Sequence, residues 1–293
     1  MRVLVLGASG MLGFALHRVL HDAGGDIVGS VRGASAPASS WCRDLCYLTN
    51  IDAQEFGSVE SAIDRIRPGV VINAIGVNRL DAVGGDLRRM FAVNSMLPRR
   101  LGAIAATRGF RLVHFSSDGV FSGRSGHYDE LVLPDADDAY GMSKYLGEAC
   151  GPQSLVLRTS LVGRSLQGGT SLLDWLLRQR GPVTGFRHVV FSGLTVDEIA
   201  SVIGRVLRHK TLPAGVFHLS SSPISKLELL ERLSAAWDLR QLDILPAEEP
   251  VSDRSLDSMK FRRLIGYEPP DWGRMIGRMK DFYAGLEQRG AAV

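Results

Sequence analysis

The stretch Val3-Leu4-Val5-Leu6-Gly7-Ala8-Ser9-Gly10-Met11-Leu12-Gly13 decides the fold of this 293-residue chain. Its four leading apolar residues predict a short buried strand, and the apolar spacing over Met11–Leu20 is typical of a helix. Between them, Gly7, Gly10 and Gly13 allow a tight turn and a close approach of a pyrophosphate to the backbone, and the helix offers free N–H groups. The glycine spacing alone is weak evidence, but its position between strand and helix predicts a dinucleotide site.

The first half of the chain repeats this alternation of strand and helix. Apolar runs predict further strands at Asp26–Val31, Val70–Ala74, Leu112–Phe115 and Ser154–Leu157. Helical patterns fall at Val59–Ile66, Pro98–Thr107 and Tyr140–Glu148. Apolar strands alternating with helices predict an α/β, Rossmann-type doubly wound parallel sheet covered on both faces. We assign this nucleotide-binding domain to residues 1–165.

The pattern changes after residue 165, and residues 166–293 are expected to form a smaller, mainly helical lobe that binds the substrate. Capping boxes at Thr195–Glu198 and Ser225–Glu228 predict two helices of about a dozen residues. Short strands are expected between and after them, at Val216–Leu219 and Leu242–Leu245. Some segments of this half are expected to return to the first domain.

Charge and composition exclude several classes of protein. The 34 basic and 31 acidic residues are scattered, without the concentrated basic surface of a nucleic-acid-binding protein. No apolar run approaches the roughly 18 residues of a membrane helix. We therefore expect neither nucleic-acid nor membrane partners. The amino-terminal apolar run is too short for a signal peptide, so a cytoplasmic location is expected.

The cysteines and histidines do not predict a metal site. Cys42, Cys46 and Cys150 lack the spacing of a zinc site and do not form a disulfide framework, so reduced thiols are expected. The seven histidines show no H-x-x-x-H or comparable spacing.

Arg32 bears on the choice of dinucleotide. It directly follows the predicted strand Asp26–Val31, which has no Asp or Glu at its tip. A carboxylate there would bind the ribose 2′-hydroxyl of NAD, whereas an arginine can meet the 2′-phosphate of NADP. Arg32 favours NADPH, with NADH as the alternative cofactor and an ordinary surface arginine as the competing interpretation.

Tyr140 and Lys144 form the sharpest motif of the chain. Their four-residue spacing places both side chains on one helix face. A nearby ammonium and the positive charge of an oxidised nicotinamide both lower a phenol's pKa from its usual value of about 10. The pair predicts that Tyr140 transfers a proton at neutral pH.

These motifs resemble the extended branch of the short-chain dehydrogenases/reductases and, within it, the dTDP-4-dehydrorhamnose reductase family. The matching stretches span nearly the whole chain: Gly7–Gly13, Pro68–Gly76, Ala92–Asn94, Ser116–Gly123, Tyr140–Glu148, Leu157–Ser160, Phe191–Thr195 and Ser255–Asp257. The chain departs from the family at Ser117, where Thr is usual, and at Gly119, where a larger, often aromatic, residue is usual.

The resemblance implies a role for each site residue. Tyr140 would donate the proton, Lys144 would tune Tyr140 and hold the nicotinamide ribose, and Ser117 would orient the substrate carbonyl. Only one of Ser116 and Ser117 should contact the substrate carbonyl, because successive strand residues point to opposite faces. Tyr140 would also contact the cofactor, and further cofactor contacts would come from Met11, Leu12, Asp52, Ala53, Asn73, Ala74, Ile75 and Gly76.

Two further residues carry competing interpretations. Asp118 either contacts the substrate or caps the turn that follows it, and the second interpretation is the simpler one. Arg187 either holds the nucleotide diphosphate through charge-assisted hydrogen bonds or is an ordinary surface residue.

The activity implied by the resemblance is the NADPH-dependent reduction of the C4 keto group of a nucleotide-linked 4-keto-6-deoxy sugar. A 4,6-dehydratase would carry Glu after Asp118, where this chain has Gly119. The alternatives are an NAD(P)-dependent nucleotide-sugar epimerase and a non-catalytic, NADP-binding regulatory subunit. The nucleotide, the sugar and any accompanying epimerisation stay open, and a homodimer is the expected assembly.

Overall fold

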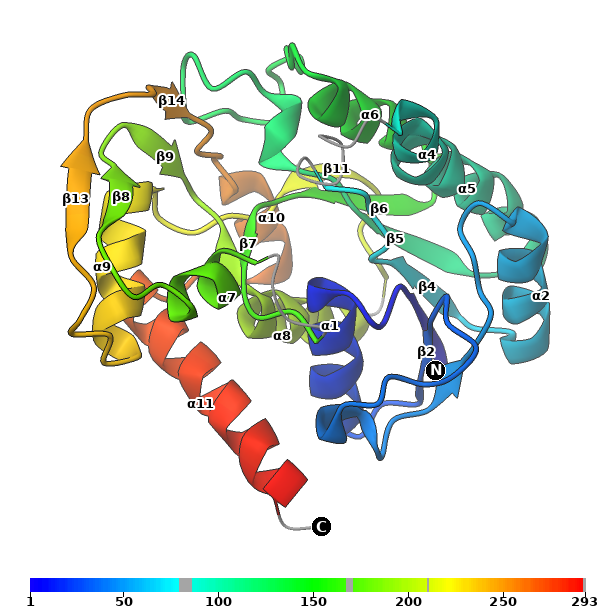
Figure 1. Cartoon of the computed structure of the whole chain (residues 1–293). Helices are drawn as coiled ribbons and strands as arrows, with labels where there is room; N and C mark the ends of the chain where they lie inside the picture. Colours follow the sequence, from blue (N-terminus) through cyan, green and yellow to red (C-terminus); the bar gives the residue numbers. More distant parts are fainter. Residues whose placement is uncertain (79–85, 167–170, 210, 292–293) are drawn as a thin grey trace.

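Seven parallel strands form the central sheet of the computed structural model, in the order β11-β6-β5-β4-β1-β2-β3 (Figure 1). The structure describes residues 1–78, 86–166, 171–209 and 211–291. The strands are β1 (Val3–Leu6), β2 (Ile27–Ser30), β3 (Tyr47–Leu48), β4 (Val70–Asn73), β5 (Arg111–Phe115), β6 (Ser154–Arg158) and β11 (Gly215–His218). The strand order reverses direction at β1, between β2 and β4, and ligands bind at such a switch point in open α/β sheets.

Helices cover both faces of this sheet, which confirms the predicted doubly wound fold (Figure 1). On one face lie α1 (Met11–Asp22) and α8 (Val196–Leu207), and on the other lie α2 (Phe56–Ile66), α5 (Leu97–Arg108) and α6 (Ala139–Gly147). Alternate residues of β1 serve the two faces: Val3 and Val5 belong to the core of α1 and α8, and Leu4 and Leu6 to that of α2 and α5.

The rest of the chain builds small sheets and helices beside the central sheet (Figure 1). The small sheets pair β10 with β7, β12 and β14 with β9, and β13 with β8. The remaining elements are η1 (Ser40–Cys42), α4 (Leu87–Phe91), the π-helical turn η2 (Ala92–Met96), the 3-10 turn η3 (Asp118–Val120), β7 (Leu161–Val162), α7 (Leu172–Leu177), β8 (Val183–Phe186), β9 (Val189–Phe191), β10 (Leu194–Thr195), β12 (Ile224–Ser225), α9 (Lys226–Ala236), β13 (Ile244–Ala247), β14 (Ser252–Asp253), α10 (Met259–Ile265) and α11 (Trp272–Ala291).

Several elements differ from the sequence-based expectation. The short strand β3 was not predicted, and β13 begins two residues after the predicted strand start at Leu242. The helices α8 and α9 begin where the capping boxes place them. Ser225 Oγ accepts a hydrogen bond from the Glu228 amide at 3.1 Å, but the Thr195 side chain makes no capping bond, so that predicted cap is wrong. No helix in the described ranges is long and apolar enough to cross a bilayer.

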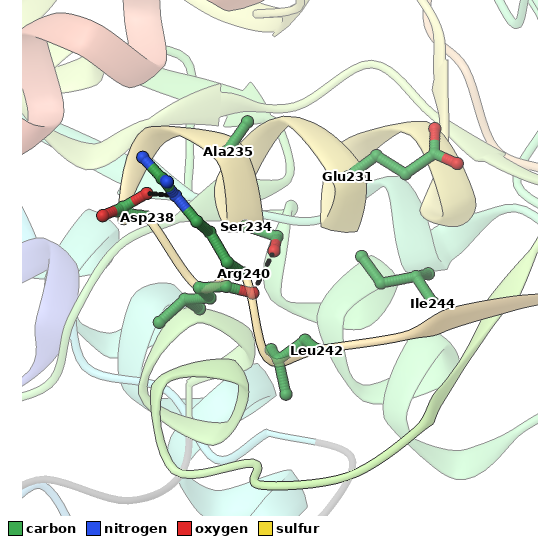
Figure 2. A pocket seen from close by; sticks show the side chains of 8 residues that line it. Glu231, Ser234, Ala235, Asp238, Arg240, Leu242 and Ile244 are labelled. Atoms are coloured by element: carbon green, nitrogen blue, oxygen red, sulfur yellow. Dashed lines mark hydrogen bonds and ion pairs between the residues drawn. The ribbon is translucent and has the colours of Figure 1, made fainter.

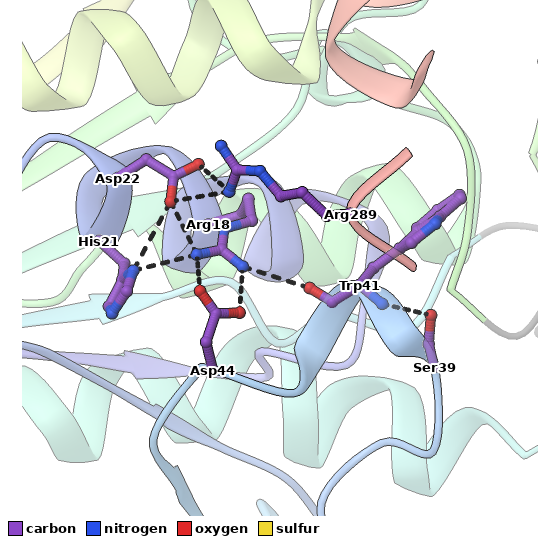
Figure 3. A network of polar contacts seen from close by, with 7 residues as sticks. All are labelled: Arg18, His21, Asp22, Ser39, Trp41, Asp44 and Arg289. Carbon is purple, nitrogen blue, oxygen red and sulfur yellow. Dashed lines mark hydrogen bonds and ion pairs between the residues drawn. The ribbon is translucent and has the colours of Figure 1, made fainter. Parts of the chain in front are cut away.

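A cluster around the buried Arg18 ties two distant segments to α1 (Figure 3). Arg18, with a side chain 1% exposed, donates to Asp44 at 2.6 and 2.7 Å and to Asp22 at 2.7 Å. Arg289 of α11 also donates to Asp22, at 3.0 Å. His21, Asp22 and Asp44 lie close enough together to be considered as metal ligands, but Arg18 already binds both carboxylates. The cluster joins α11 and the loop after η1 to α1.

Helix α6 approaches its neighbours at the level of the backbone. A Cβ atom on Gly141 would clash with the carbonyl oxygen of Gly119 in η3, and one on Gly147 would clash with the carbonyl oxygen of Asn94 in η2. Glycine is therefore required at both positions by close approach. These two contacts set the height of α6 above the turn that follows β5.

We predict that Gly147→Ala lowers the free energy of unfolding by about 1–3 kcal/mol, because the added methyl group forces α6 away from η2. Gly277→Ala in α11 is the matched control, since nothing lies within 4 Å of its Cβ position. There the better helix propensity of alanine should raise stability by about 0.5–1 kcal/mol. Urea unfolding of both variants measures the difference, and equal effects would contradict the close packing of α6.

Candidate active site

A cavity of about 390 Å³ lies at the carboxyl ends of β1, β2 and β4. It brings together eight of the predicted cofactor residues: Gly7, Gly10, Arg32, Asp52, Ala53, Ala74, Ile75 and Gly76. Met11, Leu12 and Gly13 form the first turn of α1 directly after Gly10 and do not line the cavity. Asn73 ends β4, and its Oδ1 accepts a hydrogen bond from the Ile75 amide at 3.2 Å, which holds the loop that borders the cavity.

The glycine turn beside this cavity fits a dinucleotide. Gly7 has a φ of +81°, and a Cβ there would lie 2.8 Å from the Ile75 side chain. A Cβ on Gly13 would clash with the carbonyl of Gly7, so the first turn of α1 packs directly on the strand end. Such a turn leaves backbone N–H groups facing the position of a pyrophosphate.

Near the end of β2, the cavity is lined by a residue with a hydroxyl and a residue with a guanidinium. Ser30 Oγ is buried and has no hydrogen-bond partner among the described residues. The exposed Arg32 lies two residues further along the chain, and both line the cavity. A phosphate on the ribose 2′-oxygen would satisfy both groups.

The sequence analysis missed Ser30, although its position at the end of β2, before Arg32, could have indicated it. It also missed Arg89 of α4, which lines the same cavity.

Ser117 lies between β5 and η3, directly before the first residue of η3. Its Oγ accepts a hydrogen bond from the Gly119 amide at 3.0 Å and donates to Asp118 Oδ1 at 3.2 Å. The turn is thus capped by Ser117 rather than by Asp118. Burial raises the pKa of the Asp118 carboxyl, which is 8% exposed. Ser116 instead donates to Glu148 at 2.7 Å, so the two serines make different contacts, as their alternation predicts.

Gly119 is the point at which Ser117 and Tyr140 meet. A Cβ on Gly119 would lie 2.9 Å from Tyr140 Cε1 and 3.2 Å from Ser117 Oγ. The half-buried Tyr140 ring therefore packs against this turn on the side of the Ser117 hydroxyl. Gly119 is one of the two residues at which the chain departs from the resembled family, and its lack of a side chain makes room for the Tyr140 ring.

Lys144 connects α6 to both β5 and the cofactor cavity. Its buried ammonium donates to the carbonyl oxygen of Phe115 at 2.6 Å. Burial lowers its pKa to about 8, and the charge of Glu148 opposes this shift. A Cβ on Gly76 would lie 3.9 Å from Lys144 Nζ, so the ammonium reaches the wall of the cavity.

Asn94 is a structural member of the site that sequence reasoning did not select. In the π-helical turn η2, its Nδ2 donates to Ser143 Oγ at 3.0 Å and to the Val77 carbonyl at 2.9 Å. Its Oδ1 accepts from the Val77 amide at 2.9 Å. Asn94 thereby joins α6 to the loop that borders the cofactor cavity. A π-helical turn has no sequence signature, so only the match at Ala92–Asn94 pointed to this residue.

Arg187 lies apart from these residues. It is exposed between β8 and β9, and its Nε lies 3.1 Å from Glu248 Oε1. Among the described residues, the stretch from Glu231 to Ile244 lines a separate hollow of about 460 Å³. Figure 2 shows this stretch with Arg240 paired to Asp238, and the ion pair has a length of 2.6 Å. None of the predicted site residues lines this hollow.

The titration of Lys144 yields a prediction for stability. The folded pKa of about 8 lies below the unfolded value of 10.5, so between these pH values the unfolded chain binds more protons than the folded chain. The free energy of unfolding should therefore rise from pH 8 to 10 in the wild type relative to Lys144→Met. Urea unfolding of both proteins across this range measures the difference, and a pH-independent difference would contradict the buried ammonium.

Comparison with known proteins agrees with this geometry. The sequence model of a family described as the RmlD substrate binding domain matches residues 1–283. The chain is 24% identical to the dTDP-4-dehydrorhamnose reductase of Aggregatibacter actinomycetemcomitans, over 96% of this chain and 99% of that protein. It is also 29% identical to methionine adenosyltransferase 2 subunit beta of Xenopus tropicalis, over 92% of this chain and 84% of that protein.

A solved structure shares the fold. The dTDP-4-dehydrorhamnose reductase of Bacillus anthracis, in complex with NADP, matches with a TM-score of 0.80 and 22% identity, over 95% of this chain and 98% of that one. The family match covers nearly the whole chain. The chain therefore belongs to the RmlD substrate binding domain family, the dTDP-4-dehydrorhamnose reductase family of extended short-chain dehydrogenases/reductases.

Proposed function

We propose that this protein uses NADPH to reduce the C4 keto group of a nucleotide-linked 4-keto-6-deoxy sugar. One observation carries the proposal: Ser117 and Tyr140 meet at Gly119, while Lys144 of the same helix as Tyr140 reaches the wall of the dinucleotide cavity. The names of the relatives, dTDP-4-dehydrorhamnose reductase and dTDP-4-keto-6-deoxy-D-glucose reductase, support this substrate class.

The proposed mechanism uses three side chains. When bound, the reduced nicotinamide supplies a hydride to C4 of the sugar. Ser117 Oγ, which now donates only a long hydrogen bond to Asp118, turns to donate to the C4 oxygen and orients the carbonyl. Tyr140 gives its phenolic proton to the same oxygen as charge develops there, so that the ketone becomes an alcohol.

Lys144 supports this proton transfer electrostatically. Its ammonium is fixed by the Phe115 carbonyl, one helical turn from Tyr140. A positive charge there favours the phenolate that Tyr140 becomes after donation. The same ammonium, beside Gly76, is placed to donate to the ribose of a dinucleotide in the cavity.

A second candidate function is a non-catalytic, NADP-binding regulatory subunit. It is favoured by the similarity to methionine adenosyltransferase 2 subunit beta over most of the chain. The reductase proposal is preferred because the chain has Ser117, Tyr140 and Lys144 together. We further propose that the protein acts as a homodimer, the commonest assembly of soluble oligomers, and in the cytoplasm, where its free thiols stay reduced.

The test of the function follows NADPH absorbance with dTDP-, UDP-, GDP- and CDP-linked 4-keto-6-deoxy sugars. We expect NADPH oxidation with at least one of them and a rate lowered about 10²- to 10⁴-fold in Tyr140→Phe, because the proton donor is lost. NADPH binding to the variant, measured separately, distinguishes loss of the proton donor from loss of the cofactor. Binding of NADPH without consumption of any of the four substrates would contradict the reductase and favour the regulatory subunit.

Arg32 is predicted to select the cofactor. Arg32→Ala should weaken NADPH binding roughly 10- to 100-fold, through the loss of a charge-assisted hydrogen bond, and should leave NADH binding unchanged. Arg43→Ala, which removes an exposed arginine that does not line the cavity, is the matched control. Fluorescence titration measures both dissociation constants. Equal weakening of NADPH and NADH would show that Arg32 does not read the 2′-phosphate.

A further inference from the structure

His114 of β5 is a buried histidine that the proposed mechanism does not use. It is fully buried, and in the parallel pairing of β4 with β5 it lies directly opposite Asn73. Its Nδ1 lies 3.2 Å from Asn73 Nδ2. Its Nε2 has no hydrogen-bond partner among the residues that the structure describes. A buried polar atom without a partner costs free energy, so an imidazole at this position calls for a reason beyond packing.

The amide of Ile75 fixes the orientation of the Asn73 side chain. A backbone N–H can only donate, so the atom that faces it at 3.2 Å must be the carbonyl oxygen Oδ1 of Asn73. The amide nitrogen Nδ2 must then face His114. Because Nδ2 can only donate as well, His114 Nδ1 must be the acceptor, and the proton of the neutral ring must lie on Nε2.

The surroundings of His114 keep its ring neutral. Burial, with the charge of Lys144, lowers the pKa of His114 well below its usual value. A protonated ring would carry a second N–H on Nδ1 and would present it to the Asn73 amide nitrogen, which is also a donor. The neutral ring instead offers Asn73 the acceptor that the orientation of its side chain requires.

The segment that Asn73 holds is a wall of the dinucleotide cavity. Ala74, Ile75 and Gly76 line this cavity. The Ile75 side chain also reaches the glycine turn after β1, because a Cβ on Gly7 would lie 2.8 Å from it. A wall that is already held in place before binding lowers the entropic cost of ordering it around a ligand. The hydrogen bonds from the Ile75 amide to Asn73, and from Asn73 onward to the imidazole, therefore contribute to cofactor binding.

We propose that His114 is a positioning residue for the dinucleotide: as a hydrogen-bond acceptor it orients Asn73, which in turn holds the Ile75 amide in the cavity wall. An apolar residue in place of His114 would avoid the unpartnered Nε2 but would supply no acceptor. The inference rests on the dinucleotide site of the proposed function. It concerns cofactor binding alone, however, and can be tested without substrate or turnover.

The experiment is fluorescence titration of the full chain and its variants with NADPH and with NADH. His114→Leu removes the acceptor, whereas His114→Asn places an amide oxygen near the position of Nδ1 and so keeps one. His17→Leu is the matched control, because His17 is an equally buried histidine that neither lines the cavity nor makes a hydrogen bond within the described ranges. Thermal melts check that each variant folds.

We expect His114→Leu to weaken NADPH and NADH alike, roughly 3- to 10-fold, which is the size of one neutral hydrogen bond. His114→Asn should regain most of this affinity, and His17→Leu should keep it. Wild-type affinity in His114→Leu would overturn the proposal, as would an equal loss in His114→Asn or in His17→Leu. A wild type that bound neither dinucleotide would overturn this inference and the proposed function together. A loss in His114→Leu with rescue in His114→Asn, in a protein that reduces none of the sugar nucleotides, would keep this inference and reject the reductase.

The tautomer of His114 gives a second, independent test. Nitrogen NMR of the protein with isotope-labelled histidine shows which ring nitrogen carries the proton, and the signals of His114 are those that His114→Leu lacks. We expect the proton on Nε2 and a bare Nδ1. A proton on Nδ1 would exclude the hydrogen bond from Asn73 and overturn the proposal.

Discussion

The contact of α6 with two neighbouring backbones is the constraint on which the site depends. Gly141 and Gly147 let the helix lie directly on the carbonyls of Gly119 and Asn94. At this height the Lys144 ammonium reaches the Phe115 carbonyl at 2.6 Å, and the Tyr140 ring meets the Ser117 hydroxyl across Gly119. A helix held further away by side chains would carry the same residues without bringing them to β5 and the dinucleotide cavity.

A buried polar network anchors the far end of α6. Glu148, directly after the helix, accepts from Ser116 at 2.7 Å and from Arg158 at 2.7 and 2.8 Å. Arg158 in turn meets His218 Nε2 at 3.3 Å. Burial, with the charge of Arg158, lowers the pKa of His218 to about 4, so the ring is neutral at neutral pH. Its Nδ1 then donates to the Tyr128 and Asp257 carbonyls at 3.0 and 3.1 Å. The network joins α6, β6 and β11 to the segment around Asp257.

Local patterns predicted the parts of the fold that depend on neighbouring residues. The apolar runs located β1, β4, β5 and β6, because a strand buried on both faces must be apolar throughout. The four-residue spacing of Tyr140 and Lys144 predicted that they share a helix face, because this depends on a single helix. The pairing of β11 with β6 joins segments about 60 residues apart, and local periodicity carries no information on such pairing.

The sequence predicted the site less well where the site depends on contacts between segments that are far apart in the chain. Gly119 stood out in the sequence only as a departure from a resembled family, and its packing against Tyr140 appears only in three dimensions. Asn94 acts through a π-helical turn that periodicity does not reveal. Arg187 was selected for its charge, but in the folded chain Glu248 pairs with it at the surface. Charge can be read from sequence, but the partner of a charge cannot.

The central claim is that Tyr140, Ser117 and the dinucleotide cavity form one site for hydride transfer to the sugar. Isotope transfer tests it most directly: NADPH carrying deuterium at C4 of the nicotinamide, in each stereoisomer, is incubated with the accepted sugar nucleotide, and the product is examined by NMR. The account predicts that one stereoisomer places a single deuterium at C4 of the sugar, bound to the same carbon as a new hydroxyl group. Deuterium at another carbon would contradict it, and a changed sugar with no deuterium from either isomer would contradict it and favour an epimerase.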